Sequence, residues 1–297
     1  MQTLFLTENV AVSMTKDGLK IRNGKETQTI APPYIPWDAI VIQNGFGYIS
    51  FAAMRILLSL RVSIVMLDYQ GRLMGHLAPY DRRFGGLEMR QFQAANDHKK
   101  RLSIAKSIVT RGYRRRGMNP PFSKAETIAE LMQLESMTAD EYWNIWRARL
   151  DEKWPGHDFD GRNHPRYRTR LRAVNLVNAT LNYSYALLQS SCRTMIRRVG
   201  LVPEIGFLHG EHGWSERAGE PLVWDLMELG RGWVDEAVLS WLSKSDNRTG
   251  FKRLEDWVIR LKPEATRNLI EFVSPHIRME TLWHDARDIV KTIERDK

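Results

Sequence analysis

The stretch APYDRRFGG, residues 78–86, separates two sequence patterns and so decides the fold class. Before it, short β-branched runs alternate with turn residues, a pattern typical of strands. The Asn-Gly pair inside LKIRNGK predicts a hairpin turn, because both residues tolerate the backbone of a tight two-residue loop. The expected elements of this small β-rich region are strands within 9–15, 19–25, 38–43 and 62–68 and a short helix over 50–60.

After this stretch, apolar residues recur three and four positions apart as far as the C-terminus, which predicts helices. The loops RRRGMNPPFS (114–123) and PGHDFDGRNHPRYR (155–168) contain Pro and Gly and separate helices rather than domains. We therefore expect an α+β protein with a small N-terminal β-rich domain, residues 1–85, and a larger all-α C-terminal domain, residues 86–297. The expected helices lie over 88–109, 126–135, 139–154, 173–199, 223–244 and 263–277.

Composition limits the possible partners and compartments. The chain of 297 residues has a formal charge of +9, which favours a polyanionic partner, nucleic acid ahead of membrane. The single cysteine, Cys192, excludes an internal disulfide framework and fits a reducing compartment. The N-terminus lacks a basic segment followed by an apolar core, so we expect no signal peptide and a cytoplasmic protein. Residues 49–67 are apolar, but Arg55 and Arg61 would each cost roughly 2.5–3.5 kcal/mol at a bilayer centre, so no membrane association is expected.

The basic residues are concentrated in two runs without acids. Residues 99–116 contain eight Lys or Arg, and residues 161–203 contain eight Arg. Such exclusive use of arginine favours bidentate contacts with phosphate, and nearby tyrosines such as Tyr113 and Tyr185 could stack on bases. The alternative is a solvated helical face with tyrosines in the core. The predicted DNA-contacting residues are Arg114, Arg115, Arg116, Arg162, Arg166, Arg168, Arg170 and Arg172.

Residues 206–231, GFLHGEHGWSERAGEPLVWDLMELGR, carry the candidate chemical groups. Asp225 and Glu228 are three residues apart and therefore share one face of any helix that begins near Pro221. His209 precedes a polar loop whose glycines let the chain turn back, so its imidazole can face both carboxylates. One imidazole with carboxylates suits Mg2+ or Mn2+, and the lack of usable thiols argues against structural zinc. The alternative is a hydrogen-bonded loop histidine beside a solvated helical face.

Several segments, in a fixed order after the β-rich region, carry a resemblance to a known family. They are GYISFAAMRILLSLRVSIVMLDYQGRLMGHLAP (47–79), LMQLESMTADEYW (131–143), NLVNATLNYSYALL (175–188), GLVPEIGFLH (200–209) and DLMELGR (225–231). Over nearly its whole length, the chain resembles the CRISPR-associated endonuclease/integrase, the catalytic subunit of the spacer-acquisition (adaptation) complex. The combination of NYxYALL, GxxPxxGFLH and DLMExxR in this order is far more specific than any one motif.

The resemblance implies which residues are catalytic. Glu135, His209 and Glu228 would bind one divalent ion, Mg2+ or Mn2+, and Asp225 would tune or share it. The helical domain would then be the catalytic domain. The surroundings of Glu135 agree with this role, because apolar and aromatic residues precede and follow it, and a carboxylate buried among them needs a partner.

The resemblance also implies an activity and partners. The enzyme would insert short DNA fragments with 3′-hydroxyl ends into the repeat array by attack of that hydroxyl on a phosphodiester, and a divalent ion suits this chemistry. A homodimer and a small partner protein of the same adaptation complex are expected. A metal-dependent nuclease acting on branched DNA or RNA would use the same residues, and a non-catalytic DNA-binding protein would explain the charge alone.

The sequence departs from the family pattern in three places. Ser136 follows the predicted catalytic Glu where the family commonly has Gly. The loop between His209 and the DLME motif is longer than usual. The basic helix ends in TRGYRRRG rather than in a polar NQ-like stretch. These differences leave the system subtype and the DNA preference open.

Overall fold

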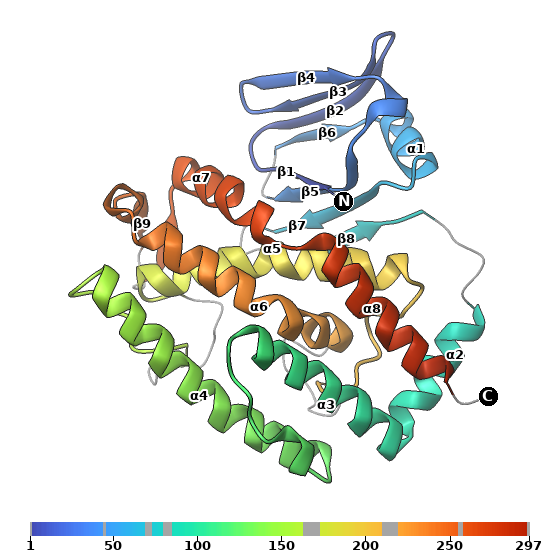
Figure 1. Cartoon of the computed structure of the whole chain (residues 1–297). Helices are drawn as coiled ribbons and strands as arrows, with labels where there is room; N and C mark the ends of the chain where they lie inside the picture. Colours follow the sequence, from blue (N-terminus) through green and yellow to red (C-terminus); the bar gives the residue numbers. More distant parts are fainter. Residues whose placement is uncertain are drawn as a thin grey trace. The chain divides into compact units, whose positions relative to one another are not determined.

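The computed structural model describes residues 2–43, 46–68, 73–79, 85–162, 173–209, 219–254 and 258–295. The chain divides into two compact units, Met1–Arg82 and Arg83–Lys297, and each is described by itself (Figure 1). The domain boundary predicted between residues 85 and 86 adjoins residues 80–84, which lie outside the described residues.

The first unit contains two four-stranded sheets. One has the strand order β1-β5-β7-β8, with β8 antiparallel to an otherwise parallel set, and the other has the order β4-β3-β2-β6. The predicted hairpin is confirmed, because Gly24 has φ of +62° and Asn23 pairs with Glu26 across the turn. The elements are β1 (Gln2–Leu6), β2 (Val10–Thr15), β3 (Gly18–Asn23), β4 (Glu26–Ile30), β5 (Trp37–Gln43), β6 (Gly47–Ile49), α1 (Phe51–Ser59), β7 (Ser63–Leu67) and β8 (Leu73–Leu77).

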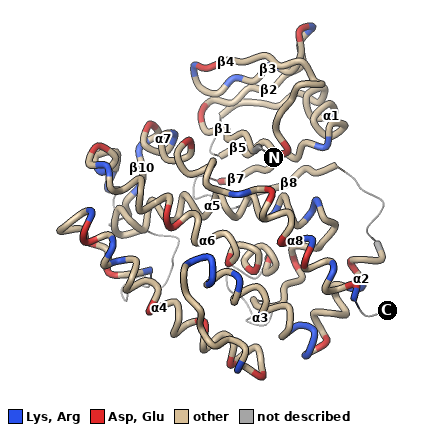
Figure 2. The backbone as a smooth tube through the Cα atoms, in the orientation of Figure 1, with Lys and Arg blue, Asp and Glu red and all other residues tan. Residues whose placement is uncertain are grey.

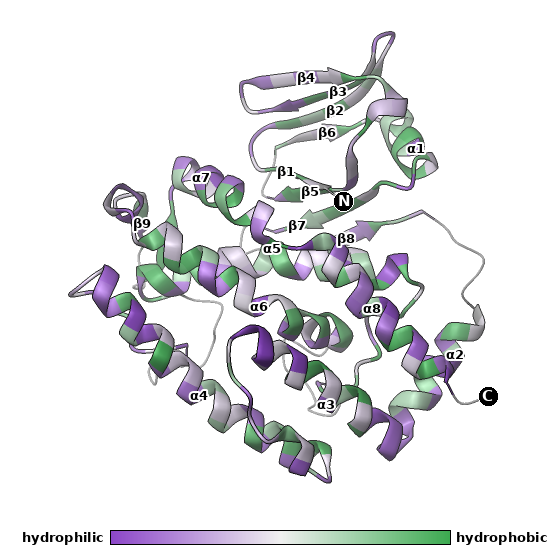
Figure 3. Ribbon diagram, viewed as in Figure 1, coloured by the Kyte–Doolittle hydropathy of each residue, from purple (hydrophilic) through white to green (hydrophobic). Residues whose placement is uncertain are grey.

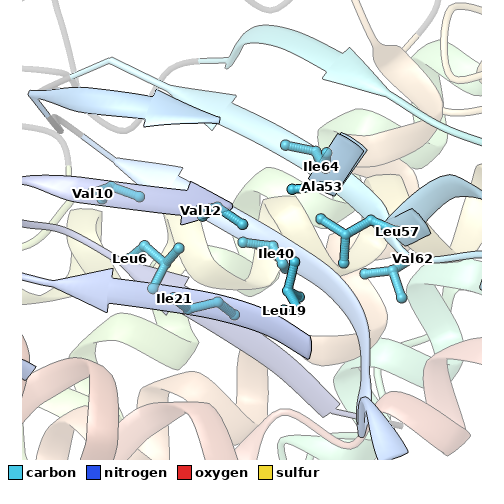
Figure 4. Close-up of a cluster of buried hydrophobic side chains, with 10 residues drawn as sticks. All are labelled: Leu6, Val10, Val12, Leu19, Ile21, Ile40, Ala53, Leu57, Val62 and Ile64. Carbon is cyan, nitrogen blue, oxygen red and sulfur yellow. The ribbon is translucent and has the colours of Figure 1, made fainter. Parts of the chain in front are cut away.

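One aliphatic core joins both sheets and α1 (Figure 4). Val12 and Ile40 come from different sheets, and Leu57 comes from the buried side of α1. The side chain of Ser50 accepts a hydrogen bond from the backbone N–H of Ala53, which caps the first turn of α1. In the described ranges, none of the helices combines the length and the apolar character that crossing a bilayer requires.

The second unit is helical, which confirms the predicted fold class. Helix α6 packs against α3 and α5, and amphipathic helices such as α4 carry alternating hydrophilic and hydrophobic patches (Figure 3). A two-stranded antiparallel sheet, β9 with β10, was not predicted. The elements are α2 (Gly85–Asn96), α3 (His98–Arg115), α4 (Ile128–Lys153), α5 (Leu176–Arg198), α6 (Pro221–Leu242), β9 (Phe251–Arg253), β10 (Ile259–Leu261), α7 (Pro263–Val273) and α8 (Met279–Glu294).

Helix α8 lies beyond the last expected helix, and two other differences from the expected helices have local causes. The helix predicted over 88–109 is interrupted at Asp97, whose side chain accepts a hydrogen bond from the backbone of Lys100 and so begins a new helix. The two helices predicted over 126–135 and 139–154 are one helix, α4. No Pro or Gly lies between them to end the first.

Glycines allow close contacts around α6. A Cβ at Gly112 of α3 would lie 2.6 Å from the carbonyl oxygen of Glu228, and one at Gly230 would lie 2.7 Å from a methyl group of Leu188 on α5. The absence of side chains at these positions lets the helices approach closely. The last turn of α3 therefore lies directly against the DLME segment of α6.

Candidate active site

Asp225 organises the segment that carries His209. The carboxylate is fully buried in α6, where Oδ2 accepts hydrogen bonds from the backbone N–H groups of Phe207 (2.6 Å) and Leu208 (3.1 Å). Oδ1 accepts from the backbone N–H of His209 (3.1 Å) and lies 2.7 Å from its Nδ1. Arg101 of α3 holds the same segment from the other side, since its Nε donates to the carbonyl oxygen of Phe207 at 2.8 Å.

These contacts set the orientation and ionisation of His209. A carboxylate can only accept hydrogen bonds, so the neutral His209 ring carries its proton on Nδ1, the nitrogen that faces Asp225. The lone pair of Nε2 then points away from Asp225. Burial alone would lower the pKa of His209, but the hydrogen bond and charge of Asp225 outweigh it and raise the pKa. The predicted role of Asp225, orienting His209, is compatible with this geometry.

Glu228 lies one turn further along α6 and is 2% exposed. Its Oε2 accepts a hydrogen bond from Nη2 of Arg116 at 3.0 Å, and its Oε1 lies 2.9 Å from Nη1 of Arg231. Burial would raise the pKa of Glu228, but the charges of Arg231 and Arg116 hold it below the usual value. Glu228 is therefore an ionised carboxylate whose two oxygens each face a guanidinium group.

Glu135 approaches from α4. Its Oε1 accepts a hydrogen bond from the hydroxyl of Tyr113 at 2.9 Å. Burial raises the pKa of Glu135, and the nearby negative charge of Glu228 raises it further. Glu228 is also close enough to His209 to raise its pKa, so Glu228 interacts electrostatically with both of the other predicted ligands.

The last turn of α3 contacts both glutamates. Tyr113 lies in the last turn of α3 and Arg116 follows the helix as its C-cap, and they bind Glu135 and Glu228 respectively. The guanidinium of Arg116 stacks on the ring of Tyr113, 4.5 Å from its centroid, and lies 5.2 Å from the ring of Tyr142. Cation–π contacts of this kind stabilise a desolvated arginine.

A further buried acid, Asp235, was missed by the sequence analysis. It accepts hydrogen bonds from the hydroxyls of Tyr142 (2.7 Å) and Tyr185, and burial raises its pKa. Asp235 lies two turns beyond Glu228, inside the apolar run GWVDEAVLSWL. An acid within such a run was the available signal, because a buried carboxylate needs partners.

Of the eight predicted DNA-contacting arginines, one is exposed, three have partners inside the protein and four lie outside the described residues. Arg114 is exposed at the positively charged C-terminal end of α3 (Figure 2). Arg115 donates to the carboxylate of the fully buried Asp285 and to a backbone carbonyl of α6, and Arg116 binds Glu228, so both have partners inside the protein. Arg162 donates to two asparagine side chains of α5. The remaining four, Arg166, Arg168, Arg170 and Arg172, lie outside the described residues, and DNA contact by the whole set stays a prediction.

The donor types of the three predicted ligands suit a hard divalent cation, but their present arrangement does not form a metal site. Within the part of the chain that the structure describes, no three His, Cys, Asp or Glu side chains are placed to hold one ion. Glu228 faces two guanidinium groups, and Glu135 faces a tyrosine hydroxyl.

Comparison with known proteins identifies the family. The family model described as CRISPR associated protein Cas1 matches residues 4–118 and 115–274. The chain belongs to the Cas1 family. A relative from Pyrobaculum aerophilum, named CRISPR-associated endonuclease Cas1 2, is 30% identical over 247 residues, which are 75% of this chain and 77% of that protein. The resemblance predicted from the sequence motifs is thus confirmed.

Solved structures show the same Cas1 fold. A structure titled "Casposase bound to integration product" matches with a TM-score of 0.83 and 24% identity, over 100% of this chain and 92% of that chain. A structure titled "Cas6-RT-Cas1--Cas2 complex" matches with a TM-score of 0.74 and 16% identity, over 100% of this chain and 35% of that chain. At these identities, the two structures establish the fold alone.

Proposed function

We propose that this chain is an endonuclease/integrase that inserts short DNA fragments into a CRISPR array during spacer acquisition. The observation that supports the proposal is that Glu135 and His209, from two other segments of a Cas1-family chain, both lie close enough to the buried Glu228 for its charge to raise their pKa values. A protein that only binds DNA gains nothing from placing the half-buried Glu135 near the buried Glu228, since desolvated like charges are costly.

The proposed reaction is a transesterification. The 3′-hydroxyl oxygen of the incoming fragment forms a bond to a target phosphorus, and the phosphorus–oxygen bond to the target 3′ oxygen breaks. The attacking hydroxyl loses its proton and the leaving oxygen gains one, so the number of phosphodiester bonds is unchanged. No nucleotide cofactor is needed, because one phosphodiester replaces another. The protein therefore has to position two strands and stabilise charge on one phosphate.

The chain's own residues supply the positioning. Asp225 fixes the His209 ring with Nε2 directed away from it, and α4 and α6 bring in the carboxylates of Glu135 and Glu228. In the proposed enzyme, Glu135, His209 and Glu228 hold Mg2+ or Mn2+, which would lower the pKa of the attacking hydroxyl and neutralise charge on the phosphate. Asp225 acts through His209 rather than on the reacting atoms.

The proposed partners are DNA, a second copy of the chain and a small protein of the same adaptation complex. Two copies would present two sites to the two ends of a short fragment. One fold neighbour carries Cas1 and Cas2 in its title, and another is titled as bound to an integration product, which supports a partner protein and DNA. A cytoplasmic location fits a single, buried cysteine.

A metal-dependent nuclease for branched DNA or RNA is the second candidate, favoured by the word endonuclease in the name of the Pyrobaculum aerophilum relative. The two functions differ in whether water or a 3′-hydroxyl attacks. Incubation of the chain with supercoiled DNA and a labelled short duplex with free 3′-hydroxyl ends separates them. Covalently joined label is the expected product. Cleavage without joining would assign the nuclease, and binding without either product would leave only a DNA-binding protein.

Isosteric variants test the site in the same assay. Glu135→Gln and Glu228→Gln should each reduce joining to background, whereas Glu141→Gln, at an exposed position of α4, should not. Asp225→Asn should lose about 10–100-fold and recover in part at high Mn2+, as expected of a residue that orients a ligand. If Mn2+ rescues Glu228→Gln but not Asp225→Asn, then Asp225 is the metal ligand and Glu228 the orienting residue. Full activity of Glu135→Gln or Glu228→Gln would refute the proposed site.

A further inference from the structure

Arg116 is an interior residue of the candidate site. Its side chain is 4% exposed, although it ends a run of three arginines at a helix terminus. Its guanidinium lies against the rings of Tyr113 and Tyr142 and donates to both the carboxylate and the backbone carbonyl of Glu228. The arginine is therefore built into the contact between α3 and α6.

The position of Arg116 matters because Glu228 is one of the proposed metal ligands. Arginine does not lose its proton in proteins, so the guanidinium leaves Glu228 only by moving. Its positive charge also repels a second cation at the same carboxylate, and this repulsion is strong where water is excluded. A divalent ion and the Arg116 guanidinium thus compete for the same negative charge.

Arg116 differs from Arg231, the other partner of Glu228. Arg231 lies three residues from Glu228 on the same helix, so its ion pair is local to α6. Arg116 reaches Glu228 from the C-terminal end of α3, and its side chain is 4% exposed against 22% for Arg231, so water screens its charge less. The charge of Arg116 therefore opposes a second cation at Glu228 more strongly than the charge of Arg231 does.

We propose that Arg116 is a positioning residue that binds the carboxylate of Glu228 in competition with a divalent ion and so sets the affinity of the site for that ion. The ion binds Glu228 only when it displaces the Arg116 guanidinium from the carboxylate. The rings of Tyr113 and Tyr142 contact the guanidinium along its faces. This inference rests on the proposed function, since it takes Glu228 as a metal ligand.

Direct metal binding tests the inference independently of DNA joining. Mn2+ is titrated into the wild-type chain, Arg116→Gln and Arg114→Gln, with free Mn2+ measured by electron paramagnetic resonance. Both variants remove one positive charge from the end of α3, but Arg114 is exposed. Arg116→Gln should bind Mn2+ at least about tenfold more tightly than wild type, because a competing buried charge is gone. Arg114→Gln should remain within about threefold of wild type, because its charge is screened by solvent.

The outcomes separate the two proposals. Equal or weaker Mn2+ binding by Arg116→Gln, while Glu228→Gln abolishes binding, would overturn the role of Arg116 and leave the metal site standing. No Mn2+ binding that depends on Glu228 would overturn both the role of Arg116 and the proposed ligand set. Tighter binding by Arg116→Gln without DNA joining by wild type would support this inference and refute the integrase.

A measurement on the wild-type chain covers the case in which Arg116→Gln does not fold. Side-chain Nε–H signals of 15N-arginine are recorded by NMR during a Mg2+ titration, with Arg116 assigned from the conservative variant Arg116→Lys. The Arg116 signal should shift in step with Mg2+ binding, and the Arg114 signal should not. An Arg116 signal that stays unchanged at saturating Mg2+ would overturn the proposal.

Discussion

The two units of the chain bury different kinds of side chain. In the described part of the strand-rich unit, the core is aliphatic and the buried polar residues are Gln43 and Ser63. The helical unit buries Asp225, Glu228 and Asp235 together with arginines. Apolar burial contributes stability without specific partners, whereas each buried charge needs a matching group. The interior of the strand-rich unit maintains its fold. The interior of the helical unit also contains ionisable side chains of the candidate site.

The largest expected effect tests the aliphatic interior. Leu57→Ala removes a fully buried side chain of α1 and should lower the free energy of unfolding of the strand-rich unit by about 2–5 kcal/mol, the cost of a core cavity. Leu60→Ala, at a position 40% exposed, should cost less than about 0.5 kcal/mol. Urea unfolding followed by circular dichroism measures both. Equal losses would show that α1 does not cover a core.

The next effect tests the polar interior. Tyr142→Phe removes one of the two tyrosine hydroxyls that donate to Asp235 and should cost about 1.5–3 kcal/mol, the range for hydrogen bonds to charged groups. Tyr34→Phe, at an exposed position, is the matched control and should be neutral. Thermal unfolding measures the difference. A neutral Tyr142→Phe would mean that Asp235 is satisfied without it, which would weaken the contrast between the two interiors.

The smallest effect is a pH dependence confined to the helical unit. The pKa of His209 is raised above 6.5 because Asp225 outweighs burial, so the folded chain binds this proton more tightly than the unfolded chain. The stabilisation is fully present below pH 6.5 and is lost as the pH rises through the raised pKa. The melting temperature of wild type relative to His209→Asn, which keeps a donor toward Asp225, should therefore fall with rising pH. A pH-independent difference would contradict the charged pair.

Sequence periodicity was sufficient for the fold class but not for the pairing of strands. The Asn23-Gly24 turn and the helix in 50–60 follow from local residue preferences and were found. The parallel pairing of β1 with β5 joins segments more than thirty residues apart, and no local pattern records it. Strands β9 and β10 have three residues each, too few to show alternation.

The candidate site was predictable in part for a similar reason. Helical spacing placed Asp225 and Glu228 on one face of α6, as the structure has them, although both are buried rather than solvated. The partners of Glu228 were not predictable. Three consecutive arginines project in directions about 100° apart around a helix, so only the packing of α3 on α6 decides that Arg116 points inward and Arg114 outward.

The contact at Gly112 limits how evolution could modify this site. A side chain there would collide with the backbone of Glu228, so no single replacement could alter the spacing of α3 and α6 without cost. Positions 113 and 116 lie on the same turn and are free of that restriction. Exchanges at these two positions would therefore change the partners of Glu135 and Glu228, while the spacing of the two helices is inherited unchanged.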